Sequence, residues 1–167
     1  MRLFVAICFD DETKRKLQSA TEKLKSLAEK GNFTRTENLH LTLAFLGETQ
    51  KRKQAEKAMD SIVAFPFEMK ISGLGRFGDI YWARAIKTEE LLRVHTRLVQ
   101  SLAKEGFDIP QGEYTPHVTL GRGVKIRQPF DFDIPEMTVY VDRIVLMKSE
   151  RINGRLVYTG IYEKKFC

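Results

Sequence analysis

The chain has 167 residues, a length that fits one domain and that can bury a substantial hydrophobic core. Its composition, 43% hydrophobic and 30% charged, is that of a globular protein and not of a disordered or fibrous one. The 28 basic side chains exceed the 22 acidic ones by six, which favours a polyanionic partner without establishing one. Two cysteines are too few for a disulfide framework or a zinc site, and no stretch approaches the roughly 20 apolar residues that span a membrane.

The first half of the chain alternates strands and helices. Residues 2–9 are β-prone and nearly all apolar, which predicts a central strand covered on both faces. The stretch runs into Asp10-Asp11-Glu12 without a small-residue cleavage site, so we interpret it as a strand and not a signal peptide, and expect a cytoplasmic protein. Asp10 is a favourable N-cap for a helix that we expect to end at Gly31.

The elements that follow are short. We expect a strand over 33–35, a strand over 39–46, a helix over 50–63 and a strand over 67–74. The glycines at 73, 75 and 78 predict a loop, and we place the seam between the two halves of the chain near 75–80.

The second half repeats this order. An apolar strand is predicted over 80–86, and Thr88 can cap a helix that runs to Gly106. His95 lies on the apolar side of that helix, where a histidine is usually a packed core residue. A strand follows Tyr114 and Pro116, and two closing strands, 139–148 and 156–163, are joined by a turn at Asn153-Gly154. The repeated order predicts one α+β domain, 1–167, of two similar lobes, each a sheet backed by helices.

One short motif, His-x-Thr followed by an apolar residue, occurs in both halves. Its copies are His40-Leu41-Thr42-Leu43 and His117-Val118-Thr119-Leu120. With the period of two expected of a strand, the first copy places His40, Thr42, Ala44 and Leu46 on one face, opposite Leu39, Leu41, Leu43 and Phe45. The two histidines are 77 positions apart (117 − 40), close to half the chain. This spacing indicates an internal duplication whose halves each present an imidazole to a shared cleft.

Two imidazoles suit acid–base chemistry, because the unperturbed pKa of histidine is about 6.5. A neutral ring can take a proton from an attacking water while a charged ring gives one to a leaving oxygen on the far side of a phosphorus atom. The hydroxyls of Thr42 and Thr119 could stabilise the phosphoryl oxygens, and Arg122 could add a two-pronged contact. Strict alternation, however, points Arg122 away from the cleft unless the strand twists or ends near Gly121 and Gly123.

Two other interpretations of the motif remain. A single His-x-Thr in a half-buried strand carries little information by itself, but two copies at this spacing favour a site. Metal binding is the second interpretation, and two histidines without a third His, Cys or carboxylate in equivalent positions make a poor metal site. We therefore expect no metal and no cofactor.

The sequence resembles the two-histidine (2H) phosphoesterase superfamily and, within it, the RNA 2′,3′-cyclic phosphodiesterases, also called 2′-5′ RNA ligases. The resemblance covers nearly the whole chain and is carried by residues 2–7, 37–43 and 45–47, the strand of Trp82, and residues 114–122. The family usually has Ala-Arg after the second motif, where this chain has Gly121-Arg122. The resemblance implies an α+β fold of two pseudo-symmetric lobes, each an antiparallel sheet backed by helices, around a central cleft.

The resemblance also implies an activity and a set of residues. The activity is metal-independent opening of a 2′,3′-cyclic phosphate on a nucleoside or RNA end to a 2′-phosphomonoester, with reversible 2′-5′ ligation in some members. We assign His40 as proton donor to O3′ and His117 as proton acceptor from water, roles that pseudo-symmetry makes easy to exchange. Phosphate contacts fall to Thr42, Thr119 and Arg122, and a base is expected to stack on an aromatic side chain. The candidates for stacking are Tyr114 and Phe9.

Two alternatives to this activity stay open. One is a related phosphodiesterase that acts on another nucleotide, such as a 2′-5′ oligonucleotide or a cyclic nucleotide-sugar phosphate. The other is a non-catalytic RNA-binding module, against which the intact His and Thr of both motifs argue. The expected partners are RNA ends or nucleotides with a 2′,3′-cyclic phosphate, without a membrane, and the protein is expected to be a monomer.

Overall fold

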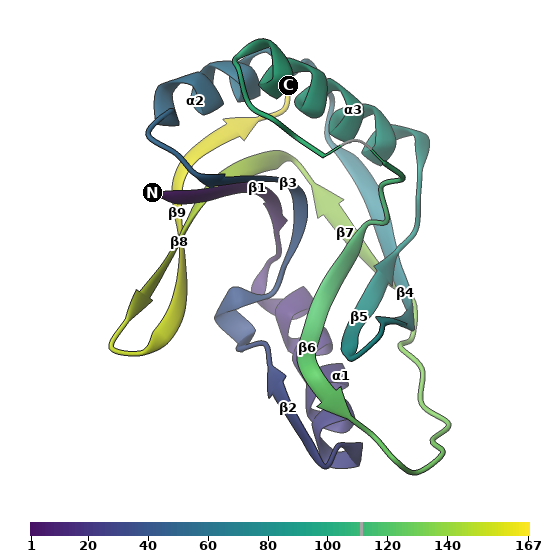
Figure 1. The fold of residues 1–167 in the computed structure, drawn as a ribbon. Helices are drawn as coiled ribbons and strands as arrows, with labels where there is room; N and C mark the ends of the chain where they lie inside the picture. Colours follow the sequence, from purple (N-terminus) through teal and green to yellow (C-terminus); the bar gives the residue numbers. More distant parts are fainter. Residues whose placement is uncertain (111) are drawn as a thin grey trace.

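The computed structural model describes residues 1–110 and 112–167 (Figure 1). In chain order its elements are β1 (Arg2–Cys8), α1 (Asp11–Leu27), β2 (Lys30–Phe33), the short 3-10 helix η1 (Thr36–Asn38), β3 (His40–Glu48), α2 (Arg52–Asp60), β4 (Phe67–Phe77), β5 (Ile80–Ala85), α3 (Glu89–Lys104), β6 (His117–Lys125), β7 (Met137–Val141), β8 (Arg143–Ile152) and β9 (Arg155–Lys165). Each predicted helix and strand has a counterpart, although several boundaries differ.

The strands form two antiparallel sheets, with the orders β3-β1-β8-β9 and β2-β6-β5-β4-β7. In each sheet the strand that carries a His-x-Thr motif pairs with the strand that precedes a long helix. Thus β3 pairs with β1, which precedes α1, and β6 pairs with β5, which precedes α3. The two β-α-β units are therefore built alike, and the predicted α+β fold of two similar lobes is confirmed.

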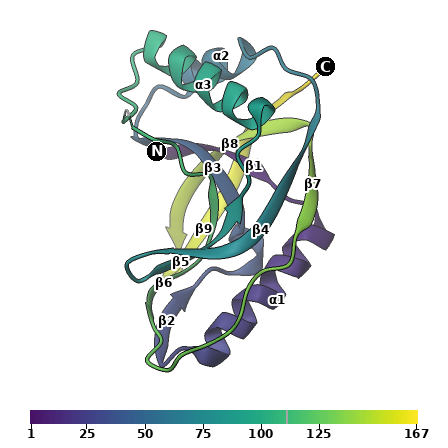
Figure 2. The ribbon, with the colours of Figure 1, turned by 90° about the vertical axis from the view of Figure 1, so that its right-hand side faces the viewer.

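Helices α1 and α3 each pack against the sheet that does not contain the strand before them. Helix α1, which follows a strand of the four-stranded sheet, packs against β2 and β6 of the five-stranded sheet. Helix α3 contacts β3, and α2 contacts β8 and β9, so these two cover the four-stranded sheet. Figures 1 and 2 show α2 and α3 side by side at one end of the molecule and α1 at the other. None of the helices in the described part of the chain has the length and apolar character that crossing a bilayer requires.

The predicted helix caps are present, but the first helix ends early. The Thr13 backbone N–H donates to Asp10 Oδ1 at 2.8 Å, and the Leu91 backbone N–H donates to Thr88 Oγ1 at 3.3 Å. Each bond satisfies a donor that the first turn of a helix leaves free. Helix α1 ends at Leu27, and not at Gly31, because the chain enters β2 at Lys30 and pairs there with β6.

The loop predicted at the glycines of 73–78 is wrong for residues 73–77, which belong to a strand. Strand β4 continues through Gly73 and Gly75 to Phe77 and pairs with β5 along this stretch. The stretch 75–80, where the seam was expected, is thus the hairpin that joins two strands of one sheet. The strands β8 and β9, from the end of the chain, pair beside β1, so the sheets do not correspond to sequence halves. The assignment of 1–167 to one domain stays a prediction.

The strand predicted over 139–148 is two strands that belong to different sheets. The break falls at Asp142, whose carboxylate accepts hydrogen bonds from the Arg143 guanidinium at 2.9 and 3.2 Å. Strand β7 closes the five-stranded sheet beside β4, and β8 enters the four-stranded sheet beside β1. Buried residues lie on both sides of the break, Val141 before it and Ile144 after it, so the apolar pattern of the sequence does not mark the change of sheet.

Strand β1 is covered on both faces, as predicted. Leu3, Val5 and Ile7 point into the main core between the sheets and the helices. Phe4 and Ala6 point the other way and form a smaller cluster with residues of β8, against which Tyr158 packs. This second cluster matters for function because Phe4 also borders the cavity described next.

Candidate active site

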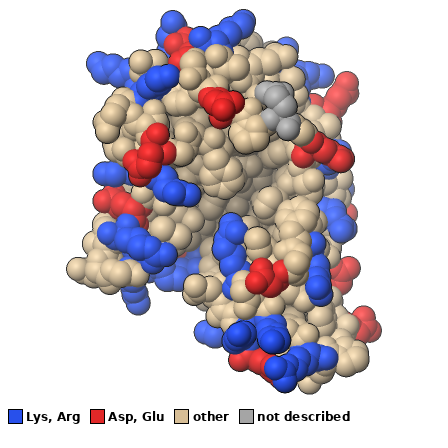
Figure 3. All heavy atoms as spheres, in the orientation of Figure 1, with Lys and Arg blue, Asp and Glu red and all other residues tan. Residues whose placement is uncertain are grey.

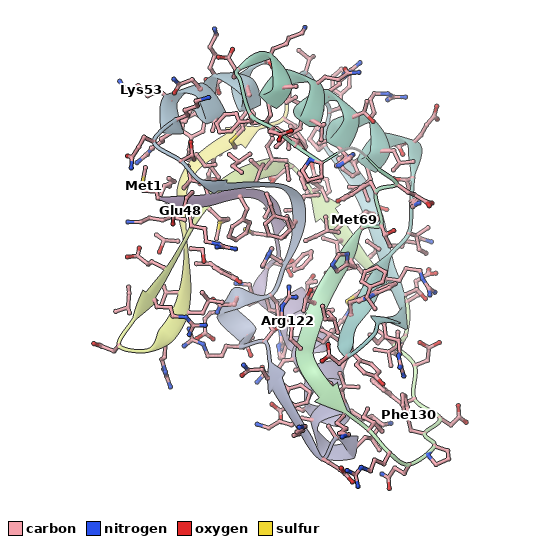
Figure 4. The ribbon with its side chains drawn as sticks, in the orientation of Figure 1. Met1, Glu48, Lys53, Met69, Arg122 and Phe130 are labelled. Carbon is pink, nitrogen blue, oxygen red and sulfur yellow. The ribbon has the colours of Figure 1, made fainter. Side chains whose placement is uncertain are left out.

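A cavity of about 1330 Å³ lies between the two sheets, and every residue expected to carry the chemistry borders it. His40 and Thr42 reach it from β3, and His117, Thr119 and Arg122 reach it from β6. Figure 3 shows a recess on this face of the molecule with Lys and Arg side chains around it. In Figure 4, Arg122 projects from β6 toward the side of the recess formed by η1 and β3.

His40 is held by its own strand. Its Nδ1 lies 2.6 Å from the backbone oxygen of Asn38, and its Nε2 lies 2.9 Å from Thr42 Oγ1. A carbonyl oxygen only accepts, so Nδ1 must carry a proton, and in the neutral ring Nε2 is then the basic atom. The ring packs against Phe4 at 4.9 Å and edge-on to Tyr158 at 5.1 Å, measured between ring centroids.

His117 repeats this arrangement in the other sheet. Its Nδ1 lies 2.7 Å from the backbone oxygen of Thr115, again two residues earlier in the chain. Its ring packs against Phe77 and Trp82, each at 5.6 Å between centroids. Both imidazoles are therefore fixed through Nδ1 and clamped by two aromatic rings. The same ring nitrogen, Nε2, is left for chemistry in each.

The protonation state of His40 depends on its surroundings. Burial lowers its pKa below the ordinary 6.5, and the charges of His117 and Arg122 lower it further, while the bond to the Asn38 carbonyl acts in the opposite direction. At neutral pH the ring of the ligand-free protein is therefore neutral. Electrostatic coupling of His117 and Arg122 with His40 also places these groups of β6 close to a residue of β3.

Arg122 faces the cavity because β6 contains a bulge. Across the β5–β6 ladder, Trp82 pairs with Thr119 but Tyr81 pairs with Gly121, so one extra residue lies on β6 between these pairs. A bulge of this kind resets the alternation of side chains. Leu120 and Gly121 are consequently both buried, and Arg122 returns to the side of His117 and Thr119. The strict alternation considered for this strand does not hold beyond Thr119.

Strand β3 has a bulge at the same place, and this corrects the predicted faces. Along the β1–β3 ladder, Ala6 pairs with Thr42 and Val5 pairs with Ala44. Ala44 is consequently buried, whereas Phe45, predicted to point to the core, is 62% exposed and borders the cavity. Sequence reasoning missed Phe45, although its position five residues after His40 matches that of Arg122 after His117.

The two aromatic residues expected to stack on a base lie elsewhere. Phe9 is 8% exposed and belongs to the main core. Tyr114 packs face to face with His95 at 3.6 Å between ring centroids, and its hydroxyl donates to the Thr42 backbone oxygen at 3.0 Å. Neither residue borders the cavity. The aromatic rings that do border the cavity include Phe45 and Tyr158.

The comparisons with known proteins agree with this architecture. Two antiparallel sheets that each bring one His-x-Thr strand to a common cavity form the fold of the two-histidine phosphoesterases. The chain belongs to the 2′-5′ RNA ligase superfamily, whose family model matches residues 10–153.

Individual relatives extend over most of the chain. A Thermotoga maritima protein named RNA 2′,3′-cyclic phosphodiesterase is 29% identical over 180 aligned positions, covering 99% of this chain and 96% of that protein. A protein of the same name from Archaeoglobus fulgidus is 32% identical, covering 80% of this chain and 78% of its own length. The crystal structure of E. coli LigT in apo form superposes with a TM-score of 0.84 at 24% identity, covering 99% of this chain and 96% of LigT. Its complex with 3′-AMP gives the same TM-score at 23% identity, with 99% and 97% covered.

Proposed function

We propose that the protein is an RNA 2′,3′-cyclic phosphodiesterase that hydrolyses the cyclic phosphate of a nucleoside or RNA end to a 2′-phosphomonoester. The observation that carries this proposal is the matched pair of imidazoles, each fixed through Nδ1 by a backbone carbonyl and each bordering one cavity. The names of the bacterial and archaeal relatives support the choice of substrate.

The proposed reaction is an in-line displacement at phosphorus. His117 Nε2 takes a proton from water as the water oxygen bonds to phosphorus. The bond from phosphorus to O3′ breaks, and O3′ takes a proton from His40 Nε2. The product keeps its phosphate on O2′. Each of the two proton transfers is typically worth about 10²–10⁴-fold in rate.

Three further groups are proposed to hold the phosphoryl oxygens. Thr42 and Thr119 each lie two residues from a histidine on its own side of the strand, so their hydroxyls can donate to an oxygen next to either ring. Arg122 offers a planar pair of N–H donors that matches two phosphate oxygens. Replacement of water by the 5′-hydroxyl of another RNA strand would give a 2′-5′ bond by the same steps, which accounts for ligation.

The two histidines have different roles in this reaction, His40 as the acid and His117 as the base. The lowered pKa of His40 favours a neutral ring, which suits a base, whereas negative charge on a bound phosphate acts in the opposite direction on the pKa of this ring. A substrate with sulfur in place of O3′ separates the roles, because a thiolate leaves without a proton. We expect His40→Ala to recover activity on this substrate and His117→Ala not to; the reverse pattern would exchange the two roles.

The function itself is tested with 2′,3′-cyclic AMP and with a short RNA that ends in a 2′,3′-cyclic phosphate. Phosphorus NMR distinguishes the 2′-phosphate expected here from a 3′-phosphate. His40→Ala and His117→Ala should each abolish turnover, whereas His95→Ala, which changes the third histidine, serves as the matched control. Turnover of a 2′-5′ oligonucleotide or a cyclic nucleotide-sugar phosphate instead would assign the site to another phosphodiester. RNA binding without any turnover would mark a binding module.

We further propose that residues 1–167 form one domain that works as a monomer in the cytoplasm. All the residues assigned to the chemistry come from a single chain and border one cavity, so one copy carries a whole site. Light scattering on the purified protein tests the monomer, and fractionation of cells that express it tests the location.

A further inference from the structure

A group of arginines that the reaction does not use lies on the wall of the cavity beside Tyr158. Arg2 begins β1, and Arg151 lies near the end of β8, and both border the cavity. Both side chains, together with Arg122, act electrostatically on the phenol of Tyr158. Tyr158 also stands edge-on to His40 at 5.1 Å, so this wall of the cavity continues from the proposed reaction centre.

Two other cations that border the cavity, Lys148 and Arg35, have acidic partners. Lys148 pairs with Glu150 at 3.3 Å. Arg35 pairs with Glu37 at 3.0 Å and also donates to the Leu156 backbone oxygen. Within residues 1–110 and 112–167, by contrast, neither Arg2 nor Arg151 has an acidic partner within 4 Å.

The carboxylate best placed to neutralise Arg2 is engaged elsewhere. Glu48 faces Arg2 across the β1–β3 ladder, yet it pairs with the N-terminal ammonium of Met1 at 3.3 Å. The contact found for the Arg151 guanidinium is the Gly154 backbone oxygen at 3.3 Å. Unpaired like charges that face one cavity repel each other and favour the binding of an anion.

The wall that carries Arg151 is held in place. Strands β8 and β9 form a hairpin that extends beyond the sheet beside η1 (Figure 1). Asn38 Nδ2 donates to the Leu156 backbone oxygen at 2.9 Å, and Arg35 donates to the same oxygen. The hairpin is therefore tied to Asn38, the residue whose backbone oxygen also fixes His40.

The size of the cavity leaves room for a second group. Its volume of about 1330 Å³ exceeds the roughly 300–1,000 Å³ typical of pockets that enclose one small ligand. The cavity is therefore large enough for more than a cyclic mononucleotide, and its lining includes Arg2 and Arg151 in addition to the residues assigned to the chemistry.

We propose that Arg2 and Arg151 form a second phosphate subsite, which holds the phosphodiester that joins the terminal nucleotide of an RNA to the one before it. The inference rests on the proposed function and deepens it, since it makes an RNA end a better substrate than a free cyclic mononucleotide. Each guanidinium offers paired N–H donors to the phosphodiester oxygens. Arg122 stays with the reacting phosphate.

The test compares three substrates that differ in this one phosphate: 2′,3′-cyclic AMP, the same compound with a 5′-phosphate, and the dinucleotide UpA ending in a 2′,3′-cyclic phosphate. The wild type should show a kcat/KM at least tenfold higher for the dinucleotide than for 2′,3′-cyclic AMP. The compound with a 5′-phosphate shows whether a terminal phosphate is enough or a linking phosphodiester is needed.

The variant Arg2→Gln/Arg151→Gln should remove at least tenfold of the dinucleotide kcat/KM and change that for 2′,3′-cyclic AMP by less than twofold. The matched control is Lys16→Gln/Arg93→Gln, which removes the same charge from α1 and α3, outside the cavity. The slope of log affinity against log salt should fall by about 0.7 for each phosphate that the variant no longer neutralises. Equal losses on both substrates, an equal loss in the control, or no dinucleotide preference in the wild type would overturn the subsite.

A binding measurement separates this inference from the proposed activity. Fluorescence anisotropy of a labelled UpA with a 3′-phosphate should show at least tenfold weaker binding to Arg2→Gln/Arg151→Gln than to the wild type or the control. That result would support the subsite even if the wild type turned over no cyclic phosphate, in which case the proposed function alone would be wrong. Equal binding by all three proteins would overturn the subsite whatever the activity.

Discussion

Phe45 and Arg122 occupy equivalent positions in the two halves of the molecule. Each lies five residues after the histidine of its motif, each follows a bulge, and each borders the cavity. The internal duplication therefore extends beyond the His-x-Thr motif to the side chain that the bulge brings to the surface. One copy has an arginine suited to a phosphate, and the other has an aromatic ring suited to a base.

This relationship predicts that Phe45 stacks on the base of the substrate. Loss of one base–aromatic stack costs about 1–3 kcal/mol, so Phe45→Leu should raise KM for 2′,3′-cyclic AMP by about 5- to 150-fold. The change should affect kcat less, because a stack on the base takes no part in the proton transfers. Because Phe45 is 62% exposed, the thermal stability of the variant should stay close to that of the wild type.

The control for this prediction is Phe65→Leu, since Phe65 is 78% exposed and lies outside the cavity. Steady-state kinetics of both variants decide between a binding role and a structural role. An unchanged KM in Phe45→Leu would contradict this role and leave Phe4, Phe33 and Tyr158 as the other aromatic residues that border the cavity.

The bulges also explain why the side-chain faces of β3 and β6 could be predicted from the sequence only in part. Over the three residues from His40 to Thr42, the period of two holds and places imidazole and hydroxyl together. A bulge depends on the register with the neighbouring strand, which the local sequence does not record. The alternation expected for Ala44 and Phe45 therefore fails, and the same effect explains how Arg122 reaches the cavity.

Other parts of the site come together only in the folded chain. Arg2 and Arg151 lie near opposite ends of the sequence and border the same cavity because β1 pairs with β8, with Arg2 opposite Ser149. The sequence offered only its excess of basic residues as a sign of them. The break at Asp142 could not be predicted for a different reason, because a strand of one sheet is followed directly by a strand of the other, with buried apolar residues on both sides of the break. Caps and turns such as Asp10 and Asn153-Gly154 were predictable because their chemistry is local.

A second prediction concerns the charge that Arg122 exerts on His40. Because this charge lowers the pKa of the ring, Arg122→Gln should raise the pKa of His40 toward the ordinary value of about 6.5. The wild-type ring should therefore become protonated only at a lower pH than the ring of the variant. NMR titration of the His40 Cε1 proton measures both values, with Arg93→Gln as a control on a remote surface. A pKa of His40 that is equal in the two proteins, or lower in Arg122→Gln, would contradict the coupling.

A third prediction concerns metal ions. The proposed mechanism assigns proton transfer to His40 and His117 and the neutralisation of phosphate charge to Arg122, so each task has a side chain. Hydrolysis of 2′,3′-cyclic AMP should accordingly continue at an unchanged rate after dialysis against EDTA and in its presence. Loss of activity that added Mg²⁺ or Mn²⁺ restores would show that a cation performs one of these tasks.

The last prediction concerns Gly75, which supports His117 through Trp82. Gly75 faces Trp82 across the β4–β5 ladder, and a Cβ atom there would lie 2.2 Å from the indole ring. Gly75→Ala should therefore displace the ring, lower the free energy of unfolding by about 1–3 kcal/mol, and lower kcat, because the same ring packs on His117 at 5.6 Å. The clash involves the outer edge of the indole, so Trp82→Phe should relieve it. Within the described residues Trp82 Nε1 has no hydrogen-bond partner, so that replacement forfeits no hydrogen bond. Urea unfolding of the two single variants and the double variant measures the coupling. An equal cost of Gly75→Ala in both backgrounds would show that its effect does not pass through Trp82.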